Sequence, residues 1–135
     1  MNDREVLSFK VTVSCIFSLD EFYVYKAAEE ETITQMQMML NKKTTSEVYS
    51  MGESIMEGDV VAAQFSVDQV FYRAKVISKV VELELDLTEV DLVEVFFIDF
   101  GNTATIPVTS TRPLSSVLLA LPALAIKCCM FNLLF

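Results

Sequence analysis

The chain has 135 residues, 53% of them apolar, and its 10 basic and 19 acidic residues give a net charge of −9. This length suits one compact domain, and the apolar share excludes an intrinsically disordered chain. The acidic excess makes nucleic acid a poor partner and favours a basic peptide, although a charge of this size also serves solubility alone.

The first predicted element is a β-hairpin. Apolar and polar residues alternate from Phe9 to Phe17, which predicts a strand with one apolar face. Residues 18–21 form a predicted turn, and residues 22–25 are rich in strand formers. We therefore expect the second strand to pair back on the first.

A helix is predicted to begin near Ala28, where the apolar period changes. One helical face then carries four apolar residues: Ile33, Met36, Met39 and Leu40. Glutamates 29–31 fall in the first turn and Lys42 and Lys43 at the end, and both placements suit the helix dipole. Such a Met-rich face is either a groove for a partner helix or ordinary core, and core is the commoner of the two.

The second half of the chain is predicted to be a small β-barrel. Residues 44–57 show no strong period and form the best internal boundary. Strands are predicted at 60–65, 70–81, 92–99 and 103–108, with a loop or hairpin end at 82–91 and a tight turn at 100–102. A short helical turn at 114–121 and a returning strand at 124–133 follow.

The cysteines and the apolar C-terminal region exclude two further classes. Cys15, Cys128 and Cys129 are odd in number and form no CxxC pair, and the start of the chain is too polar for a signal peptide. We expect reduced, buried thiols in an intracellular protein. The uncharged run 113–126 is shorter than the ~20 residues of a spanning helix, so it predicts buried structure or an interface.

Aromatic residues gather near the predicted turns of the barrel, in residues 61–65, 71–74 and 95–102. Such rings are usually core, but rings at strand ends beside a Gly-Asn turn can line a hole open to solvent. A cation held over an aromatic ring gains about 0.5–2 kcal/mol, and a side-chain amide can bond a planar guanidinium. The sequence contains no histidine, so we expect no enzyme, no metal site and no cofactor.

Residues 58–65, 71–76 and 95–102 resemble, in this order, the motifs of the Tudor domain of germline Tudor-family proteins. The flanking hairpin, the helix and residues 112–128 resemble the flanks of an extended Tudor module. The resemblance implies a mainly β fold with a linker helix (α+β), in which a small SH3-like barrel is joined to a partial OB-like, staphylococcal-nuclease-like fold. The expected division is 1–57 for the N-terminal strands and linker helix, 58–110 for the Tudor barrel and 111–135 for the returning segment.

The family's methylarginine cage falls, by position, on Phe65, Tyr72, Phe97 and Phe100, and its amide partner falls on Asn102. Every ring position is aromatic here, so the resemblance implies a complete cage. The two later phenylalanines replace residues that are often tyrosine, which keeps the π faces and removes hydroxyl groups.

Four nearby residues are expected to have structural or surface roles. By resemblance, Arg73 and Asp99 form a structural ion pair inside the barrel, since one buried charge without the other is costly. The alternative is that Asp99 faces the bound peptide. Phe71 is expected to pack in the core, and Asp68 and Glu94 are expected to be solvated surface.

The resemblance implies a non-catalytic module that binds symmetrically dimethylated arginine in the Arg-rich tail of a Piwi-clade Argonaute protein. Methylation keeps the charge and makes the group broader and less hydrated, which suits an aromatic slot. The expected setting is a scaffold for piRNA-mediated transposon silencing in cytoplasmic, perinuclear germ granules (nuage), with no direct contact to nucleic acid or membrane.

Two alternatives remain open. One is a reader of unmethylated arginine, because the acidic charge attracts any basic tail. The other is a dimerisation or scaffold module that acts through the nuclease-like part or the apolar C-terminal segment, since extended Tudor modules usually continue further than this chain. A nuclease is rejected because no histidine or Arg/Glu/Asp cluster suits metal-dependent phosphodiester cleavage.

Overall fold

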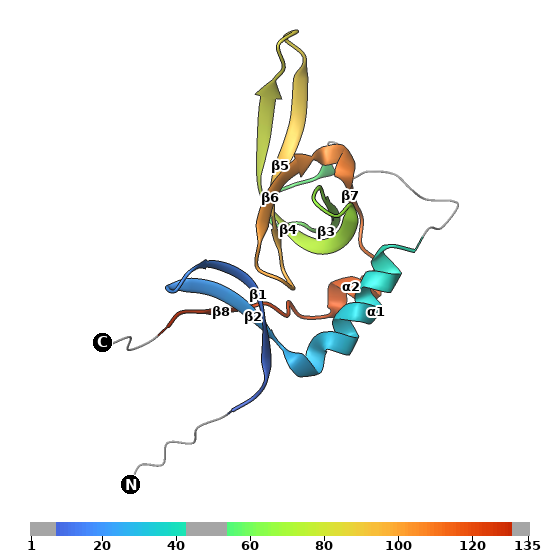
Figure 1. Ribbon diagram of the computed structural model, residues 1–135. Helices are drawn as coiled ribbons and strands as arrows, with labels where there is room; N and C mark the ends of the chain where they lie inside the picture. Colours follow the sequence, from blue (N-terminus) through green and yellow to red (C-terminus); the bar gives the residue numbers. More distant parts are fainter. Residues whose placement is uncertain (1–7, 43–53, 131–135) are drawn as a thin grey trace.

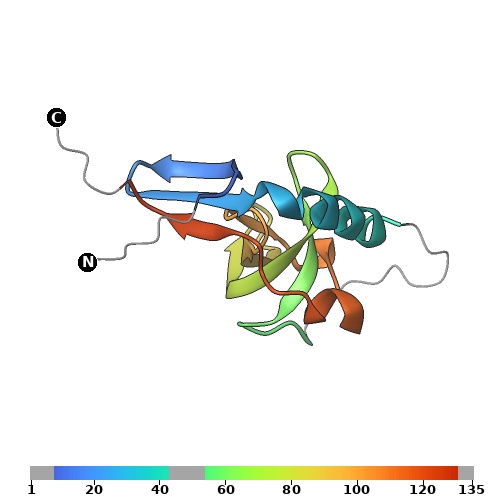
Figure 2. The same cartoon turned by 90° about the horizontal axis from the view of Figure 1, so that it is seen from below.

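The structure, a computed structural model, describes residues 8–42 and 54–130, and it contains two antiparallel β-sheets joined by helices (Figure 1). The smaller sheet has the order β1-β2-β8, formed by β1 (Val11–Ser18), β2 (Glu21–Lys26) and β8 (Ile126–Cys128). Figure 2 shows that β8, near the C-terminal end of the chain, lies beside β2. The predicted fold class, mainly β with a linker helix, is confirmed.

The larger sheet has the order β6-β5-β4-β3-β7 and curls around its own core (Figure 1). Its strands are β3 (Val60–Phe65), β4 (Val70–Leu83), β5 (Glu89–Phe97), β6 (Thr103–Pro107) and β7 (Thr111–Arg112), with the 3-10 helix η3 (Val108–Ser110) before β7. The core is built from small and β-branched side chains with one ring: Ile55, Val61, Ala63, Ala74, Val76, Val93, Val95, Phe97, Ile106 and Val108. Alternate residues of each strand supply it, as expected for a half-buried sheet.

A long hairpin of β4 and β5 extends beyond this core. Of the two structures predicted for residues 82–91, a loop or a hairpin end, the hairpin end is confirmed. The ladder continues through the pairs Val81↔Asp91 and Leu83↔Glu89, so only residues 84–88 connect the strands. Acidic residues alternate with Val and Leu here, which is a strand pattern that the charge obscured. We call residues 79–92 the arm (top of Figure 1).

The two helices share a second core with the smaller sheet. The 3-10 helix η1 (Ala27–Glu29) leads into α1 (Glu30–Leu40), and α2 (Ser116–Ala120) lies near the end of the chain. The buried members of this core are Tyr25, Ile33, Met36 and Leu118. Most of the predicted apolar face of α1 is therefore core, but the Met39 side chain is exposed.

The smaller sheet leaves apolar side chains uncovered by the described residues. Val11, Val13 and Phe17 of β1 are 42%, 52% and 52% exposed, so the apolar face predicted for this strand is not buried here. β8 is also shorter than the predicted strand 124–133, whose residues 131–133 lie outside the described part. Within that part, neither helix has the length and apolar character needed to cross a bilayer.

Candidate aromatic binding site

A pocket of about 230 Å³ lies at the end of the barrel that faces the smaller sheet. Its lining contains all five residues of the predicted cage together with two others, and the seven are Ser14, Phe65, Asp68, Tyr72, Phe97, Phe100 and Asn102. Strand pairing explains how the rings meet. Phe65 ends β3, Tyr72 stands near the start of β4 where it pairs with Ala63, and Phe97 ends β5.

The four rings meet edge to face around a buried floor. Phe97 is only 1% exposed, and its ring centroid lies 5.5 Å from that of Phe65 and 5.8 Å from that of Tyr72. The rings of Tyr72 and Phe100 lie 5.3 Å apart at 83°. Perpendicular rings present walls and a floor, which is an arrangement that surrounds a cation with π electron density.

Asp68 is exposed, as predicted, and it also lines this pocket, a position that the sequence did not indicate. Asp68 lies in the connection between β3 and β4, and its carboxylate accepts a hydrogen bond from the hydroxyl of Tyr72 on β4. Burial is the larger cause and this hydrogen bond the second of the rise in the pKa of the Tyr72 hydroxyl from its ordinary value of 10 to about 12. A carboxylate at the rim favours a cationic ligand.

The turn after β5 fixes Phe100 and Asn102. Phe97 accepts hydrogen bonds through its carbonyl from the amides of Phe100 and Gly101, and its own amide donates to the Asn102 carbonyl at 2.9 Å. Gly101 has φ +94°, and a Cβ atom there would lie 2.1 Å from the Tyr23 ring. Only glycine therefore allows β2 to pack so closely on the turn.

Ser14 of β1 brings the smaller sheet to the pocket. Its hydroxyl donates a 2.6 Å hydrogen bond to the Phe100 carbonyl and so ties the outer wall of the pocket to the aromatic turn. This residue was not predicted from the sequence, because a serine within an alternating strand gives no signal of a contact so distant in the chain.

Arg73 and Asp99 form a buried ion pair, but not inside the barrel as predicted. Residues 72, 74 and 76 of β4 contact the barrel core, so alternation turns the Arg73 side chain outward. Its Nε and Nη2 atoms donate to the two Asp99 oxygens at 2.9 and 2.6 Å. The remaining guanidinium donors bond the carbonyls of Leu118, Leu121 and Pro122. The pair therefore joins the barrel to α2 and the segment that follows it.

The same alternation places Phe71 outside the barrel core. Its ring is buried, with the Arg112 guanidinium 3.9 Å from the ring centroid. The side chain of Asn41, just after α1, donates to the Phe71 carbonyl at 3.1 Å and accepts from the Phe71 amide at 2.8 Å. The end of α1 thereby positions the start of β4 and hence Tyr72, a role that the sequence analysis missed.

The site contains four rings, one carboxylate, one side-chain amide and the hydroxyl groups of Ser14 and Tyr72, a set of groups that can bind a cationic ligand. Across residues 8–42 and 54–130, no three His, Cys, Asp or Glu side chains gather to hold a metal ion. The arrangement suits a flat cation with apolar edges, inserted between the rings with its charge near Asp68.

Known proteins resemble this chain over nearly its whole length. A family profile described as Tudor domain matches residues 4–132. Tudor domain-containing protein 6 of Mus musculus is 32% identical over 123 residues, which cover 91% of this chain and 5% of that protein.

Two solved structures share the fold. The extended Tudor domain from BmPAPI in complex with sDMA superposes with a TM-score of 0.76 at 26% identity, over 93% of this chain and 66% of that one. A complex described as Tudor and Aubergine [R15(me2s)] gives a TM-score of 0.71 at 26% identity, over 88% and 66%. This chain therefore spans a small part of the mouse protein and just under two thirds of each solved chain.

Proposed function

The chain belongs to the Tudor domain family, and from that premise we propose that it is a non-catalytic module that binds symmetrically dimethylated arginine in a partner's Arg-rich tail. The observation that carries this proposal is the pocket in which Phe65 and Tyr72 pack on the buried Phe97 ring and Phe100 packs on Tyr72, with Asp68 at the rim.

The chemistry of the ligand matches that of the pocket. Dimethylation keeps the positive charge of the guanidinium but replaces hydrated N–H groups by methyl groups. The methyl groups pack against the ring faces, and the charge interacts with both the rings and the Asp68 carboxylate. An unmethylated guanidinium keeps more of its water and fills less of the space between the rings.

The similar structures support this ligand. The BmPAPI domain is in complex with sDMA, and the second structure contains an Aubergine segment with a symmetrically dimethylated arginine. We extend this to a Piwi-clade Argonaute tail as partner, to scaffolding of piRNA-mediated silencing, and to cytoplasmic germ granules as location. Co-localisation of the tagged protein with a Piwi protein in germ cells tests this extension, and a uniform distribution would contradict it.

A peptide titration tests the reader function. The probe is a short Gly/Ala-rich peptide with one central arginine, prepared with and without symmetric dimethylation, and binding is followed by calorimetry. We expect the methylated peptide to bind about tenfold more tightly, equivalent to about 1.4 kcal/mol and within the range of a desolvated cation–π contact. Equal affinities would instead support a reader of unmethylated arginine.

Phe65→Ala is the decisive variant, because Phe65 is a half-buried wall of the pocket, whereas loss of the Phe97 floor would also empty the barrel core. We expect it to weaken binding of the methylated peptide about tenfold or more while the fold remains. Phe9→Ala removes a ring that is 56% exposed outside the pocket and should leave the affinity unchanged. If both variants bind like the original protein, the cage assignment is wrong.

Assembly with a second copy through the smaller sheet is a second candidate function. The exposed Val11, Val13 and Phe17 side chains of β1 favour it, because uncovered apolar residues on an edge strand promote association. Light scattering over a concentration series should show dimers that Val13→Thr weakens, and a strict monomer at high concentration would contradict this candidate.

A further inference from the structure

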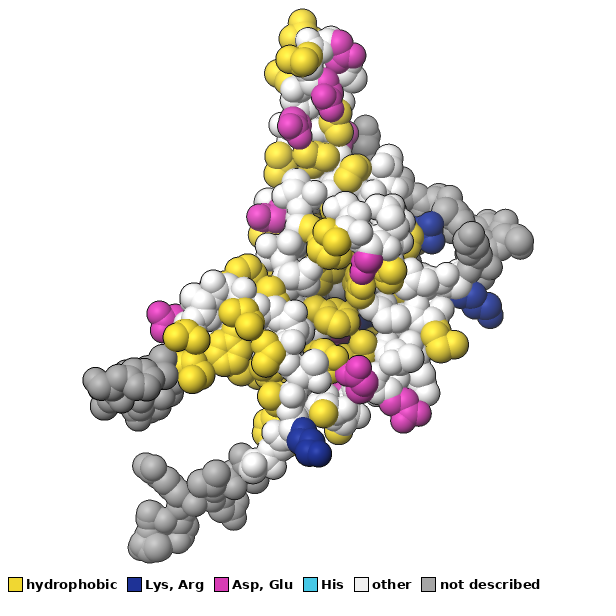
Figure 3. All heavy atoms as spheres, viewed as in Figure 1, with side chains coloured by type: hydrophobic (Ala, Val, Ile, Leu, Met, Phe, Trp, Pro, Cys, Tyr) yellow, Lys and Arg dark blue, Asp and Glu magenta, His cyan; other side chains and the backbone are white. Residues whose placement is uncertain are grey.

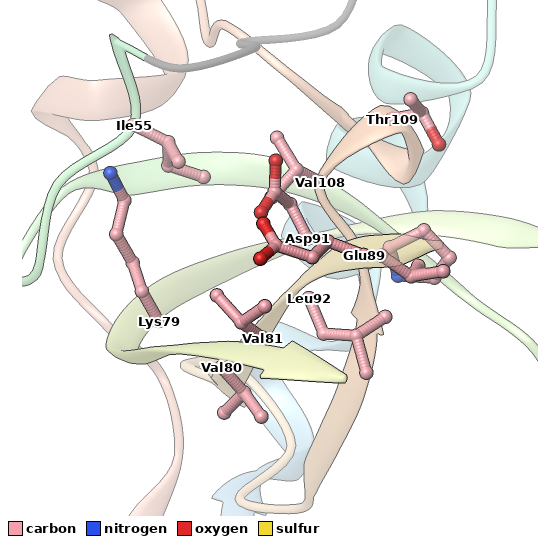
Figure 4. A pocket seen from close by; sticks show the side chains of 11 residues that line it. Ile55, Lys79, Val80, Val81, Glu89, Asp91, Leu92, Val108 and Thr109 are labelled. Carbon is pink, nitrogen blue, oxygen red and sulfur yellow. The ribbon is translucent and has the colours of Figure 1, made fainter. Parts of the chain in front are cut away.

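A second and larger cavity, of about 680 Å³, is shown in Figure 4. It lies at the opposite end of the barrel from the aromatic pocket. It is bounded on one side by the arm and on the other by the end of β6 and η3, with lining residues that include Pro107, Val108 and Thr109. β4 and β5 connect the two ends, since Tyr72 and Phe97 belong to the aromatic pocket and Lys79 and Asp91 belong to this cavity.

The wall toward the barrel is apolar. Ile55 is fully buried and Val108 is 9% exposed, and both belong to the barrel core. On the arm, Val81 pairs with Asp91 and Leu83 with Glu89, so these four side chains share one face. Val93, two residues beyond Asp91, is buried in the core, so this is the face that looks toward the barrel.

The arm is strongly acidic. Residues 79–92 contain five carboxylates and one lysine, and within the described residues none of these groups is in an ion pair. Glu89 and Asp91 both line the cavity, and Lys79 lies nearer to Ile55 in Figure 4. This charge repels anionic lipid, nucleic acid and a second copy of the arm, and it attracts a cation.

The arm is also unusually apolar for an exposed hairpin. Val81 and Leu83 are 60% and 63% exposed, and Leu85 is fully exposed. The upper part of Figure 3 shows hydrophobic side chains next to acidic ones along the arm. β3 pairs with β4 only as far as Lys75, so the outer edge of β4 from Ile77 onward has no neighbouring strand among the described residues. Exposed apolar side chains beside open backbone groups are typical of an interaction surface.

We propose that the arm and its cavity form a second docking surface, which binds an extended segment of a partner protein carrying Lys or Arg beside apolar residues. The basic heads pair with Glu89 and Asp91, while apolar side chains and the aliphatic stems cover Val81 and the apolar wall. The surface is separate from the aromatic pocket, so both can be occupied together.

Fluorescence anisotropy with a labelled peptide of the repeat Lys-Lys-Val-Val tests the proposal on the full chain. In an extended conformation, each face of this peptide alternates cationic and apolar side chains. A Lys-Lys-Ser-Ser peptide has the same charge and no apolar residues, and we expect it to bind about tenfold more weakly. Equal binding of the two peptides would reduce the interaction to non-specific charge attraction and overturn the proposal.

Two matched pairs of substitutions locate the surface. Glu89→Gln with Asp91→Asn removes two charges from the cavity face, and Glu82→Gln with Glu94→Gln removes two from the opposite face of the same strands. We expect the first pair to weaken binding of the Lys-Lys-Val-Val peptide about tenfold and the second less than twofold, with unchanged thermal unfolding in both. Equal effects, or no binding by the original protein at low salt, would overturn the proposal.

Discussion

The two ends of the barrel are stabilised in different ways. At the aromatic end, Arg73, Gly101 and Asn41 connect the barrel to α2, β2 and α1, so the rings depend on contacts from segments distant in the chain. At the arm end, the hairpin makes its contacts along its own two strands and projects into solvent. Substitutions of these three connecting residues should therefore change folding and binding together, whereas those on the arm should change binding alone.

The largest expected effect is that of Arg73→Met. It leaves the Asp99 carboxylate buried without its cation and removes three donors from carbonyl groups near α2. Breaking a buried pair in this way costs about 3–5 kcal/mol of unfolding free energy, which urea denaturation measures. Lys79→Met makes the same change at the exposed arm end, and it should shift the unfolding free energy by less than about 0.5 kcal/mol. Similar losses in the two variants would remove the contrast between the ends.

A glycine pair tests the junction with the smaller sheet. Gly101→Ala combines an unfavourable φ of +94° with a Cβ atom 2.1 Å from the Tyr23 ring, so we expect a loss of about 2–4 kcal/mol and weaker binding of the methylated peptide. Gly58→Ala has φ +89° but no atom within 4 Å of the new Cβ, so backbone strain alone should cost about 1 kcal/mol. Thermal and urea unfolding of both variants measure the difference, and equal losses would mean that β2 does not pack closely on the turn.

The connection from α1 is expected to contribute less. Asn41→Ala leaves the amide and carbonyl of Phe71 without their side-chain partner, which costs about 1–3 kcal/mol. Gln35→Ala, at an exposed position on the same helix, should be nearly neutral. Hydrogen exchange of the Phe71 amide gives a local readout, and unchanged protection in Asn41→Ala would contradict this role.

The difference between the ends also explains what the sequence could predict. The aromatic residues were predictable because a motif with fixed spacing places Phe65, Tyr72 and Phe97 at neighbouring strand ends. Ser14 and Asn41 were not, since each acts through a contact with a segment far away in the chain. The cage assignment itself stays a prediction until a ligand is bound.

Two predictions were wrong. One concerned the face of β4 on which Arg73 lies, and the other concerned the lengths of β4 and β5 in the arm. The Arg73–Asp99 pair was placed inside the barrel, although the buried Ala74 and Val76 side chains already mark the inward face of β4 as the even-numbered one. The two strands of the arm were predicted to stop at 81 and to resume at 92, with a loop or hairpin end between them, because acidic residues are poor strand formers. The cross-strand ladder shows that acidic residues alternating with Val and Leu do form paired strands here.

The smallest expected effect concerns the Tyr72 hydroxyl. The pKa of this tyrosine is raised to about 12, first by burial and then by the hydrogen bond to Asp68, from an ordinary value of 10. A raised pKa means that the folded state holds the proton more tightly than the unfolded state does. Its stabilising contribution is therefore complete below about pH 10 and is lost as the pH rises toward about 12.

Ultraviolet difference absorbance should show one tyrosine titrating near pH 12 that disappears in Tyr72→Phe. Tyr25 provides the internal comparison, because burial and its hydrogen bond to Glu30 raise its pKa as well, and its side chain is outside the lining of the pocket. Since the hydroxyl bonds Asp68 at the exposed rim, Tyr72→Phe should change the unfolding free energy by less than about 1 kcal/mol. Binding of the methylated peptide should also show no Tyr72 ionisation up to about pH 10, whereas a transition near the ordinary value of 10 that is lost in Tyr72→Phe would mean that the hydroxyl is not held by Asp68.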